Sequence, residues 1–378
     1  MKRRAISLSG HFFYQVFSYQ RCASNRFPFL FRNCLVQKLS SLSSSTSSSR
    51  PFPDYSPKKP TIRDSELVHH ISTVIKQRRS EPLRRILKPY ESKFRTQHLI
   101  WVLMNIKNDY KLVLDFFEWV CLRRCYPSLE ARCIVIQIAV SAKDSKMARR
   151  LICDFWMKPN LDASLSFAHF VERLIYTYKE WGSNPCVFDI FFEVLVEVGM
   201  LDEARIFFDK MLNYGLVISV ESCNLFLSRL SNNSDSDGLE MTLKSFKEFS
   251  QVGVCWNTAS HNIMIHSLCR LGKVKEAHHL LLQMELKGWC TPDVISYSTV
   301  INGYCNAGEL QIVLKLIEEM QMKGLKPNPF TLNSIVLSLC KTGKVVDAER
   351  VLREMMRQGI VPDNVVYTTL IDGFCKVG

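Results

Sequence analysis

The chain has 378 residues, of which 47% are hydrophobic and 22% are charged, and its formal net charge is +13. This composition suits a globular or repeat protein with an ample core. No apolar run approaches the 18 residues that a membrane-spanning helix requires, so the sequence argues against membrane insertion.

Residues 1–53 differ from the rest of the chain. They contain eight basic residues and no acidic one, and a serine-rich tract runs from Ser40 to Ser49. We interpret this segment as a disordered organellar transit peptide, with a basic tail as the alternative. Arginines interspersed with phenylalanines favour the mitochondrion, while the serine tract keeps the chloroplast open. Of the net charge of +13, this segment supplies +8, which leaves +5 for the remainder. That mild excess is compatible with RNA but does not establish it.

The next part of the chain is predicted to be helical without a clear repeat. Residues 54–93 are interpreted as a linker with N-terminal helices, and residues 94–184 as a degenerate, repeat-like helical region. Within it, DYKLVLDFFEWV (109–120) and DSKMARRLICDFW (144–156) have helical patterns but lack glycine and proline punctuation.

The last third of the chain repeats with a period of about 35 residues. Recurring glycines occur at Gly272, Gly308, Gly343 and Gly378, and recurring prolines at Pro292, Pro327 and Pro362. A fixed period of this length is typical of a solenoid. In such folds the function usually lies on a surface shared by several repeats.

One repeat, 294–328, shows how the pattern arises. Its first half carries an apolar stripe at helical spacing, formed by Tyr297, Val300, Ile301, Tyr304 and Cys305. The second half carries another, formed by Leu310, Val313, Leu314, Ile317 and Met320. Gly308 and Gly324 are expected to end the two helices in the left-handed conformation. The repeat is therefore predicted to be a hairpin of two helices that needs neighbours on both sides.

The predicted units are 185–219, the divergent repeat 220–257, then 258–293, 294–328, 329–363 and the partial repeat 364–378. Segments such as VISYSTVINGYCNAGELQIVLKLIEEMQMKGLKPN and NVVYTTLIDGFCKVG resemble the pentatricopeptide repeat, and the whole is similar to P-type plant organellar members. The resemblance is specific over 258–378 and weaker upstream, where SNNSDSDG (231–238) has the composition of a lengthened turn. It implies an all-α, right-handed α-solenoid of stacked helix-turn-helix hairpins that binds single-stranded organellar RNA, one nucleotide per repeat.

The resemblance also implies which residues read the bases, namely the fifth and the last residue of each repeat. The pairs are Asn224 with Asn257, Asn262 with Asp293, Ser298 with Asn328, and Asn333 with Asp363, followed by Thr368 alone. By the family's code these pairs imply the target 5′-(C/U)UAU(purine)-3′. The pair Asp189 and Ser219 matches no pairing in that code. Asn offers both a donor and an acceptor, which suits a pyrimidine edge. The alternative is that Asn and Ser only solvate or cap a helix end.

The second residue of each repeat is expected to pack against the bases. Ile295, Phe330 and Val365 suit that role, whereas Ala259 is small and Glu221 would repel the RNA backbone. The repeat 220–257 is therefore expected to bind weakly.

The sequence shows no catalytic or cofactor-binding pattern. His278 and His279 are adjacent, hence on different faces of one helix, and no Glu completes a metalloprotease motif. His261 takes a position that Tyr occupies in other repeats and is expected to pack. Cys269, Cys305, Cys340 and Cys375 recur on one apolar stripe and are expected to be buried thiols rather than metal ligands. We therefore expect neither enzyme activity nor a metal or cofactor.

The sequence stops at Gly378, where a second helix is expected to begin, so Leu370, Ile371 and Phe374 are predicted to lack a covering helix. The chain therefore reads as truncated at its C-terminus. Other RNA-processing proteins are further candidate partners. A protein-interaction scaffold, or a fragment without function, remains an alternative.

Overall fold

The computed structural model describes residues 59–78, 81–123, 127–156, 163–178, 181, 183–232, 236–357 and 361–377. Every regular element in these ranges is helical. The α-helices are α3 (Ile62–Gln77), α4 (Leu83–Ile86), α5 (Thr96–Ile106), α6 (Tyr110–Leu122), α7 (Leu129–Ser141), α8 (Ser145–Trp156), α9 (Ala163–Thr177), α10 (Cys186–Val198), α11 (Leu201–Asn213), α12 (Val220–Asn232), α13 (Ser236–Gln251), α14 (Thr258–Arg270), α15 (Val274–Leu286), α16 (Val294–Ala307), α17 (Leu310–Met322), α18 (Pro329–Lys341), α19 (Val345–Arg357) and α20 (Asn364–Val377). A short 3₁₀ helix, Lys88–Tyr90, follows α4. The predicted transit peptide lies outside the described residues.

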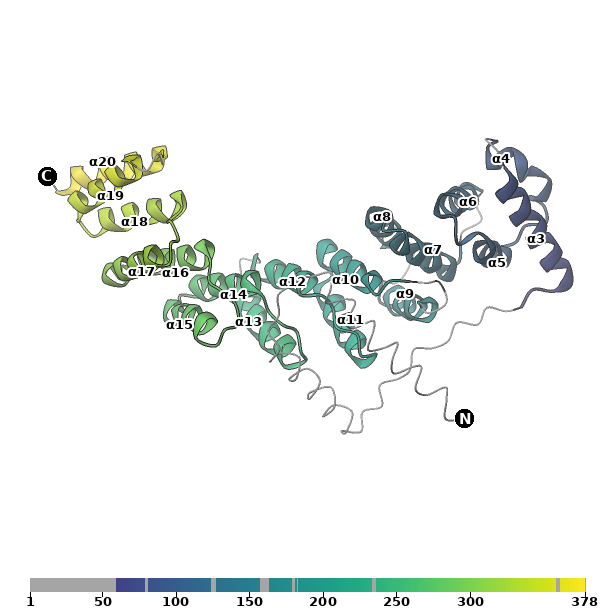
Figure 1. The fold of residues 1–378 in the computed structure, drawn as a ribbon, viewed down its shortest axis with the longest axis horizontal. Coiled ribbons are helices and arrows are strands. Elements are labelled where there is room, and N and C mark those ends of the chain that lie inside the picture. The colour runs from purple at the N-terminus through teal and green to yellow at the C-terminus, as the bar shows by residue number, and fades with distance from the viewer. Residues whose placement is uncertain are drawn as a thin grey trace. The chain divides into compact units, whose positions relative to one another are not determined.

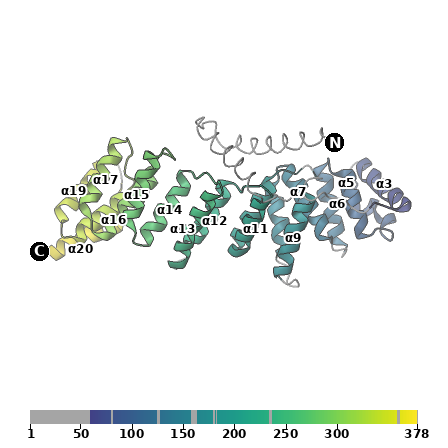
Figure 2. The ribbon, with the colours of Figure 1, turned by 90° about the horizontal axis from the view of Figure 1, so that it is seen from below.

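From α10 onward the helices form hairpins, and each hairpin packs on the next (Figure 1 and Figure 2). The first helices pack on one another in chain order, α10 on α12, α12 on α14, α14 on α16, α16 on α18, and α18 on α20. We call these six the A helices, and their hairpin partners α11, α13, α15, α17 and α19 the B helices. This neighbour-to-neighbour packing confirms the predicted all-α fold of stacked hairpins. The right-handed sense of the solenoid stays a prediction.

Recurring glycines end the A helices of three repeats. Gly272, Gly308 and Gly343 have φ of +74°, +76° and +74°. This left-handed conformation is costly for residues with a Cβ, which is why glycine recurs here. The helix ends predicted at Gly308 and at Gly324, which has a φ of +71°, are therefore confirmed. Gly378 and Gly359 lie outside the described residues.

The apolar stripes form one continuous core from α14 to α20. All five stripe residues of α16 are buried, whereas the stripe predicted for α17 is wrong at one position. Leu314 is 47% exposed, and Leu316 is buried in its place, at 1%. The inner face of α17 is centred on Val313, Leu316 and Met320, so a residue one step past Val313 points outward.

The cysteines and the last helix depart from the expected burial at several points. Cys305 and Cys340 are buried as predicted, whereas Cys269 is only partly buried. Cys375 is exposed, because no later helix among the described residues packs over that side of α20. On the same helix Ile371 and Phe374 are exposed, at 63% and 44%. Leu370, expected to lie uncovered, is instead buried against the preceding hairpin.

The lengthened turn predicted at SNNSDSDG is wrong at the five positions that the structure describes, and residues 233–235 lie outside the described ranges. Ser231 and Asn232 belong to α12, and α13 already begins at Ser236. The extra length of this repeat is taken up by α13, which has 16 residues, whereas α15, α17 and α19 each have 13. Ser and Asp near the N-terminus of a helix favour initiation as well as turns, which explains why composition alone misassigned the segment.

Upstream, helices α6 and α8 confirm the two helices predicted there. Helix α9 departs from the hairpin pattern, in which each helix packs on its neighbour in the chain. It packs on α7 instead, and α10 packs on α8. The fully buried Gln137 of α7 links it to α9 by donating from Nε2 to Leu174 O at 2.9 Å and to Thr177 Oγ1 at 2.6 Å. Phe170 of α9 stacks on Phe191 of α10 with ring centroids 5.1 Å apart. This region is therefore helical and continuous with the core of the first hairpin, without the regular repeat.

Candidate nucleic-acid interface

The last residue of each repeat caps the A helix of the next. Asn257, Asp293 and Asn328 accept from the backbone N–H three residues later, at 3.0, 2.9 and 2.8 Å, and Asp363 does the same for Val366 at 2.9 Å. Such bonds satisfy amides that the helix leaves free at its start. The capping role considered as the alternative for these residues is therefore real, and it fixes where their remaining atoms point.

The same side chains contact the fifth residue of their own repeat. Asn224 Nδ2 donates to Asn257 Oδ1 at 3.2 Å, and Asn262 Nδ2 donates to Asp293 Oδ1 at 3.1 Å. In the pair nearest the C-terminus, Asn333 Nδ2 donates to Asp363 Oδ2 at 2.9 Å. The structure thus brings together three of the sequence-predicted pairs directly.

The remaining pair, Ser298 and Asn328, is joined through an intermediate residue. Thr331 Oγ1 lies 2.6 Å from Ser298 Oγ and 2.7 Å from Asn328 Oδ1. Sequence analysis did not single out Thr331. It stands third in its repeat, where Ser222, Ser260 and Ser296 stand in the preceding ones, and this recurrence is visible in the sequence.

Three exposed apolar side chains follow the same register. Ile295, Phe330 and Val365 are exposed at 58%, 61% and 60%, and each is the second residue of an A helix. Ala259 and Glu221 occupy the equivalent places in the two earlier repeats and are exposed as well. The three apolar residues therefore repeat at the spacing of the hairpins.

A shallow groove of about 230 Å³ crosses the A helices α12, α14 and α16. Asn262 of α14 and Ile295 of α16 line it, together with Ser228 of α12 and His266 of α14. The groove therefore joins one predicted base-reading residue to one predicted base-packing residue. Thr368 and Val365 line a second concavity on α20. We call the surface that carries these residues on α12 to α20 the reading face.

Three of the five A helices of the reading face have no acidic residue, whereas α12 contains Glu221 and α20 contains Asp372. α14, α16 and α18 contain no acidic residue and carry Arg270 and Lys341 as their only Arg or Lys. Acidic side chains on such a surface would repel phosphates, so this composition is compatible with a nucleic acid.

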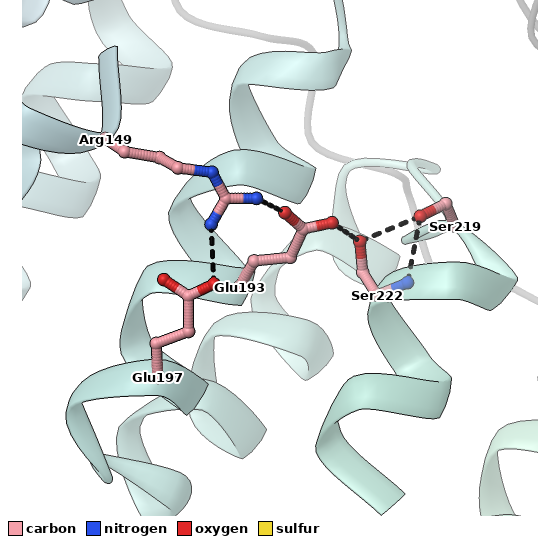
Figure 3. Close-up of polar contacts among 5 residues, drawn as sticks. All are labelled: Arg149, Glu193, Glu197, Ser219 and Ser222. Atoms are coloured by element: carbon pink, nitrogen blue, oxygen red, sulfur yellow. Dashed lines mark hydrogen bonds and ion pairs between the residues drawn. The ribbon is translucent and has the colours of Figure 1, made fainter. Parts of the chain in front are cut away.

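Helix α10 has the opposite character. Its sequence contains Asp189, Glu193 and Glu197 and no basic residue. Figure 3 shows how side chains of α8 and α12 bind two of these acids. Arg149 of α8 pairs with Glu193, and its Nη1 donates to Glu197 Oε1 at 2.9 Å. Ser222 Oγ of α12 donates to Glu193 Oε1 at 2.7 Å. The polar groups of α10 are thus engaged within the protein.

Asp189, the fifth residue of the first repeat, is also engaged internally. Its side chain accepts from the backbone N–H of Ser219 at 2.8 Å and is only 7% exposed. Burial is the main cause that raises the pKa of Asp189 to about 7, against the lowering effect of the Ser219 hydrogen bonds. This pair contrasts with the pair Asn262 and Asp293, of which Asn262 lines the groove.

The histidines have structural environments. His261 is buried, its Nδ1 lies 2.9 Å from Asn257 O, and its ring stacks near Trp289. Burial lowers the pKa of His261, so the ring is neutral near pH 7. His278 Nδ1 lies 3.1 Å from Tyr304 Oη, and His279 Nε2 lies 2.7 Å from Gln283 Nε2. Within the ranges that the structure describes, no group of three His, Cys, Asp or Glu side chains is arranged to hold a metal ion.

Comparison with known proteins identifies the repeats. The pentatricopeptide repeat family model matches residues 292–341 and 327–376, and further pentatricopeptide repeat models match 252–285 and 187–216. The chain carries pentatricopeptide repeats. The matched segments include A helices α10, α14, α16, α18 and α20, so the pentatricopeptide repeats carry most of the reading face.

Two relatives from Arabidopsis thaliana extend the comparison. The chain is 61% identical over 251 residues to the mitochondrial pentatricopeptide repeat-containing protein At1g05670, a match that covers 66% of this chain and 33% of the relative. It is 34% identical to the mitochondrial protein At2g26790, covering 61% of this chain and 28% of the relative. The chain thus spans about a third of the length of these relatives. Their names confirm the mitochondrial location expected from the N-terminal segment.

Among solved structures, the pentatricopeptide repeat protein PPR10 from maize matches with 16% identity and a TM-score of 0.45. That match covers 81% of this chain and 46% of PPR10. In the ranges described here, no helix is both long enough and apolar enough to cross a bilayer.

Proposed function

We propose that this pentatricopeptide repeat protein binds single-stranded RNA on the reading face, one nucleotide per repeat, with the core target 5′-(C/U)UAU(purine)-3′. It acts by occupancy in mitochondrial RNA processing, stability or translation, and it carries out no catalysis itself. Other RNA-processing proteins are the partners that such occupancy would serve.

The observation that carries the proposal is a constellation that recurs once per repeat. A pair of polar side chains, joined by hydrogen bonds, stands beside an exposed apolar side chain at the next repeat's second residue. Asn262 and Asp293 stand beside Ile295, and Asn333 and Asp363 stand beside Val365. A base edge needs hydrogen-bonding groups, whereas a base face needs an apolar surface. One such set per repeat suits the reading of single bases by helical repeats.

The charge pattern supports a particular end to the stretch of repeats that binds RNA. The A helices α14, α16 and α18 lack acids, whereas α10 carries three and pairs two of them with Arg149. We therefore assign the first read nucleotide to the repeat of α12, where Glu221 weakens contact, and no nucleotide to the repeat of α10.

The test is a fluorescence-anisotropy titration of the full chain against 5′-CUAUA-3′ in a neutral flank. Asn333→Ser should shift the preference at the fourth nucleotide from U towards G, because the shorter side chain leaves room for a purine. The change in preference should be about 1–3 kcal/mol, the cost of a single mismatched base pair in a protein–DNA site. 5′-CUAGA-3′ is the matched RNA for the variant.

Asn213→Ser is the control variant, because Asn213 is exposed at the end of the B helix α11. It should leave both affinities unchanged. Equal, salt-sensitive binding to every RNA would mean a nonspecific basic surface and would refute base reading. A folded chain that binds no RNA would instead favour a protein-interaction scaffold.

A further inference from the structure

The third residue of every repeat from 220 onward is fully buried between two A helices. Ser222, Ser260, Ser296, Thr331 and Val366 are each 0% exposed. The first four carry a hydroxyl, and Val366 does not. A hydroxyl both donates and accepts, so a buried one requires partners. The partners differ from repeat to repeat, and this difference reaches the reading pairs.

The hydroxyl of Ser296 contacts both members of the pair Asn262 and Asp293. Ser296 Oγ lies 2.6 Å from Asn262 Oδ1 and accepts from Asp293 N at 3.1 Å. Because Asn262 Nδ2 donates to Asp293 at the same time, the carboxamide is held at both its oxygen and its nitrogen. One Nδ2 hydrogen remains for a base. Thr331 Oγ1 likewise contacts both Ser298 and Asn328.

The pair Asn333 and Asp363 has the same two residue types but lacks this third contact. Val366 has no hydroxyl to offer, and Asn333 Oδ1 is buried without a hydrogen-bond partner. The carboxamide is held only at its nitrogen, by Asp363. Asn224 Oδ1 is also unpaired, because Ser260 Oγ bonds to Asn257 instead. A buried acceptor without a partner is costly, and the group that carries it is poorly fixed.

We infer that the third residue of a repeat is a positioning residue for the reading pair of the preceding repeat. A hydroxyl there that bonds to the fifth residue of the preceding repeat, as Ser296 and Thr331 do, fixes the carboxamide or hydroxyl that faces the base. An apolar residue, or a hydroxyl bonded elsewhere as in Ser260, leaves that group free to turn. The two Asn/Asp pairs should therefore prefer the same base with different strictness: the pair at Asn262 discriminates sharply, and the pair at Asn333 does so weakly. This inference rests on the proposed function, because it needs RNA to be read on this face.

The first measurement uses the unaltered full chain. Anisotropy titrations with 5′-CUAUA-3′, 5′-CCAUA-3′ and 5′-CUACA-3′ give the U-to-C affinity ratio at the second and at the fourth nucleotide. The ratio at the second nucleotide, assigned to Asn262, should exceed that at the fourth by about three- to tenfold, the factor that corresponds to one net hydrogen bond. Equal ratios at both nucleotides would overturn the inference.

Two variants then move the hydroxyl. Val366→Thr places one beside Asn333, as Thr331 is placed beside Ser298, and should raise the U-to-C ratio at the fourth nucleotide by about three- to tenfold. Ser296→Ala should lower the ratio at the second nucleotide by a similar factor. Val313→Thr, at a fully buried site of the B helix α17, is the control for a buried Val→Thr change and should alter neither ratio.

Base discrimination separates positioning from a merely structural role. Loss of stability lowers the affinity for every RNA together, whereas positioning changes the ratio at one nucleotide only. Unchanged ratios in Val366→Thr and Ser296→Ala, with Asn333→Ser still switching the base, would overturn the inference and leave the proposed function standing. Loss of all base preference in the unaltered chain would overturn both.

Discussion

Asp189→Asn should remove a pH-dependent loss of stability from the folded chain. Burial, as the leading cause, raises the pKa of Asp189 to about 7, from an ordinary value of 3.8. Because the folded-state pKa lies above the unfolded one, the fold favours the protonated carboxyl. The stabilisation is therefore complete below pH 3.8 and is lost as the pH rises through about 7.

The size of this effect follows from the two pKa values. They differ by about 3 pH units, and each unit corresponds to about 1.4 kcal/mol, so the full loss of unfolding free energy is about 4 kcal/mol. About 2–3 kcal/mol of it falls between pH 5 and pH 8. Asparagine keeps an acceptor for the Ser219 N–H and does not ionise. Urea unfolding at several pH values in this range should show the variant gaining about 2–3 kcal/mol on the wild type.

The comparison at each pH cancels the contributions of groups that both proteins share, including His261. Asp202→Asn, which alters an exposed aspartate of α11, controls for the change in net charge. A difference between Asp189→Asn and wild type that stays constant from pH 5 to pH 8 would show that Asp189 ionises alike in the folded and unfolded chains. The argument from burial would then be wrong.

Three further predictions concern packing and the reading face. Ile301→Ala, at a fully buried site, should lower the unfolding free energy by about 2–5 kcal/mol, whereas Leu314→Ala, 47% exposed, should cost clearly less in the same urea titrations. Gly303→Ala should cost about 1–3 kcal/mol, because its Cβ would lie 3.0 Å from Cys269 Sγ and 3.1 Å from Val274 Cγ1; an unchanged midpoint would show that these side chains move aside freely. Phe330→Ala should weaken RNA binding by about 1–3 kcal/mol in anisotropy titrations without lowering the thermal midpoint, because the ring is 61% exposed.

The repeat architecture was predictable because each signal is local. Gly308 ends a helix through its own φ, and Asp293 begins one through a bond three residues away. Such features depend on spacing alone, so they can be recognised in the sequence about once every 35 residues. The order of the helices on the reading face followed from the same regularity, whereas the pairing of fifth with last residues came from the resemblance to the pentatricopeptide repeat.

Features that depend on contacts between repeats were not predictable. Arg149 and Glu193 are 44 residues apart, and nothing in either local sequence indicates their ion pair. The length of α13 and the position of α9 depend on how neighbouring helices pack, which the hydrophobic pattern leaves open. The role of the third residue was partly visible as a recurring hydroxyl, but its partner is fixed only by the register between hairpins.

Close packing of the A helices connects stability to base reading. Gly303 of α16 lies against Cys269 of α14, and Gly373 of α20 lies against Cys340 of α18, so the helices approach where a side chain would hold them apart. That approach is what brings Ser296 within 2.6 Å of Asn262, since both contacts join the same two helices. The change Gly303→Ala should therefore loosen the reading pair at Asn262 on α14. It should leave the pair at Asn333 on α18, two A helices further along, unaffected. The reading geometry of each repeat is in this sense a property of the interface between two hairpins rather than of either hairpin alone.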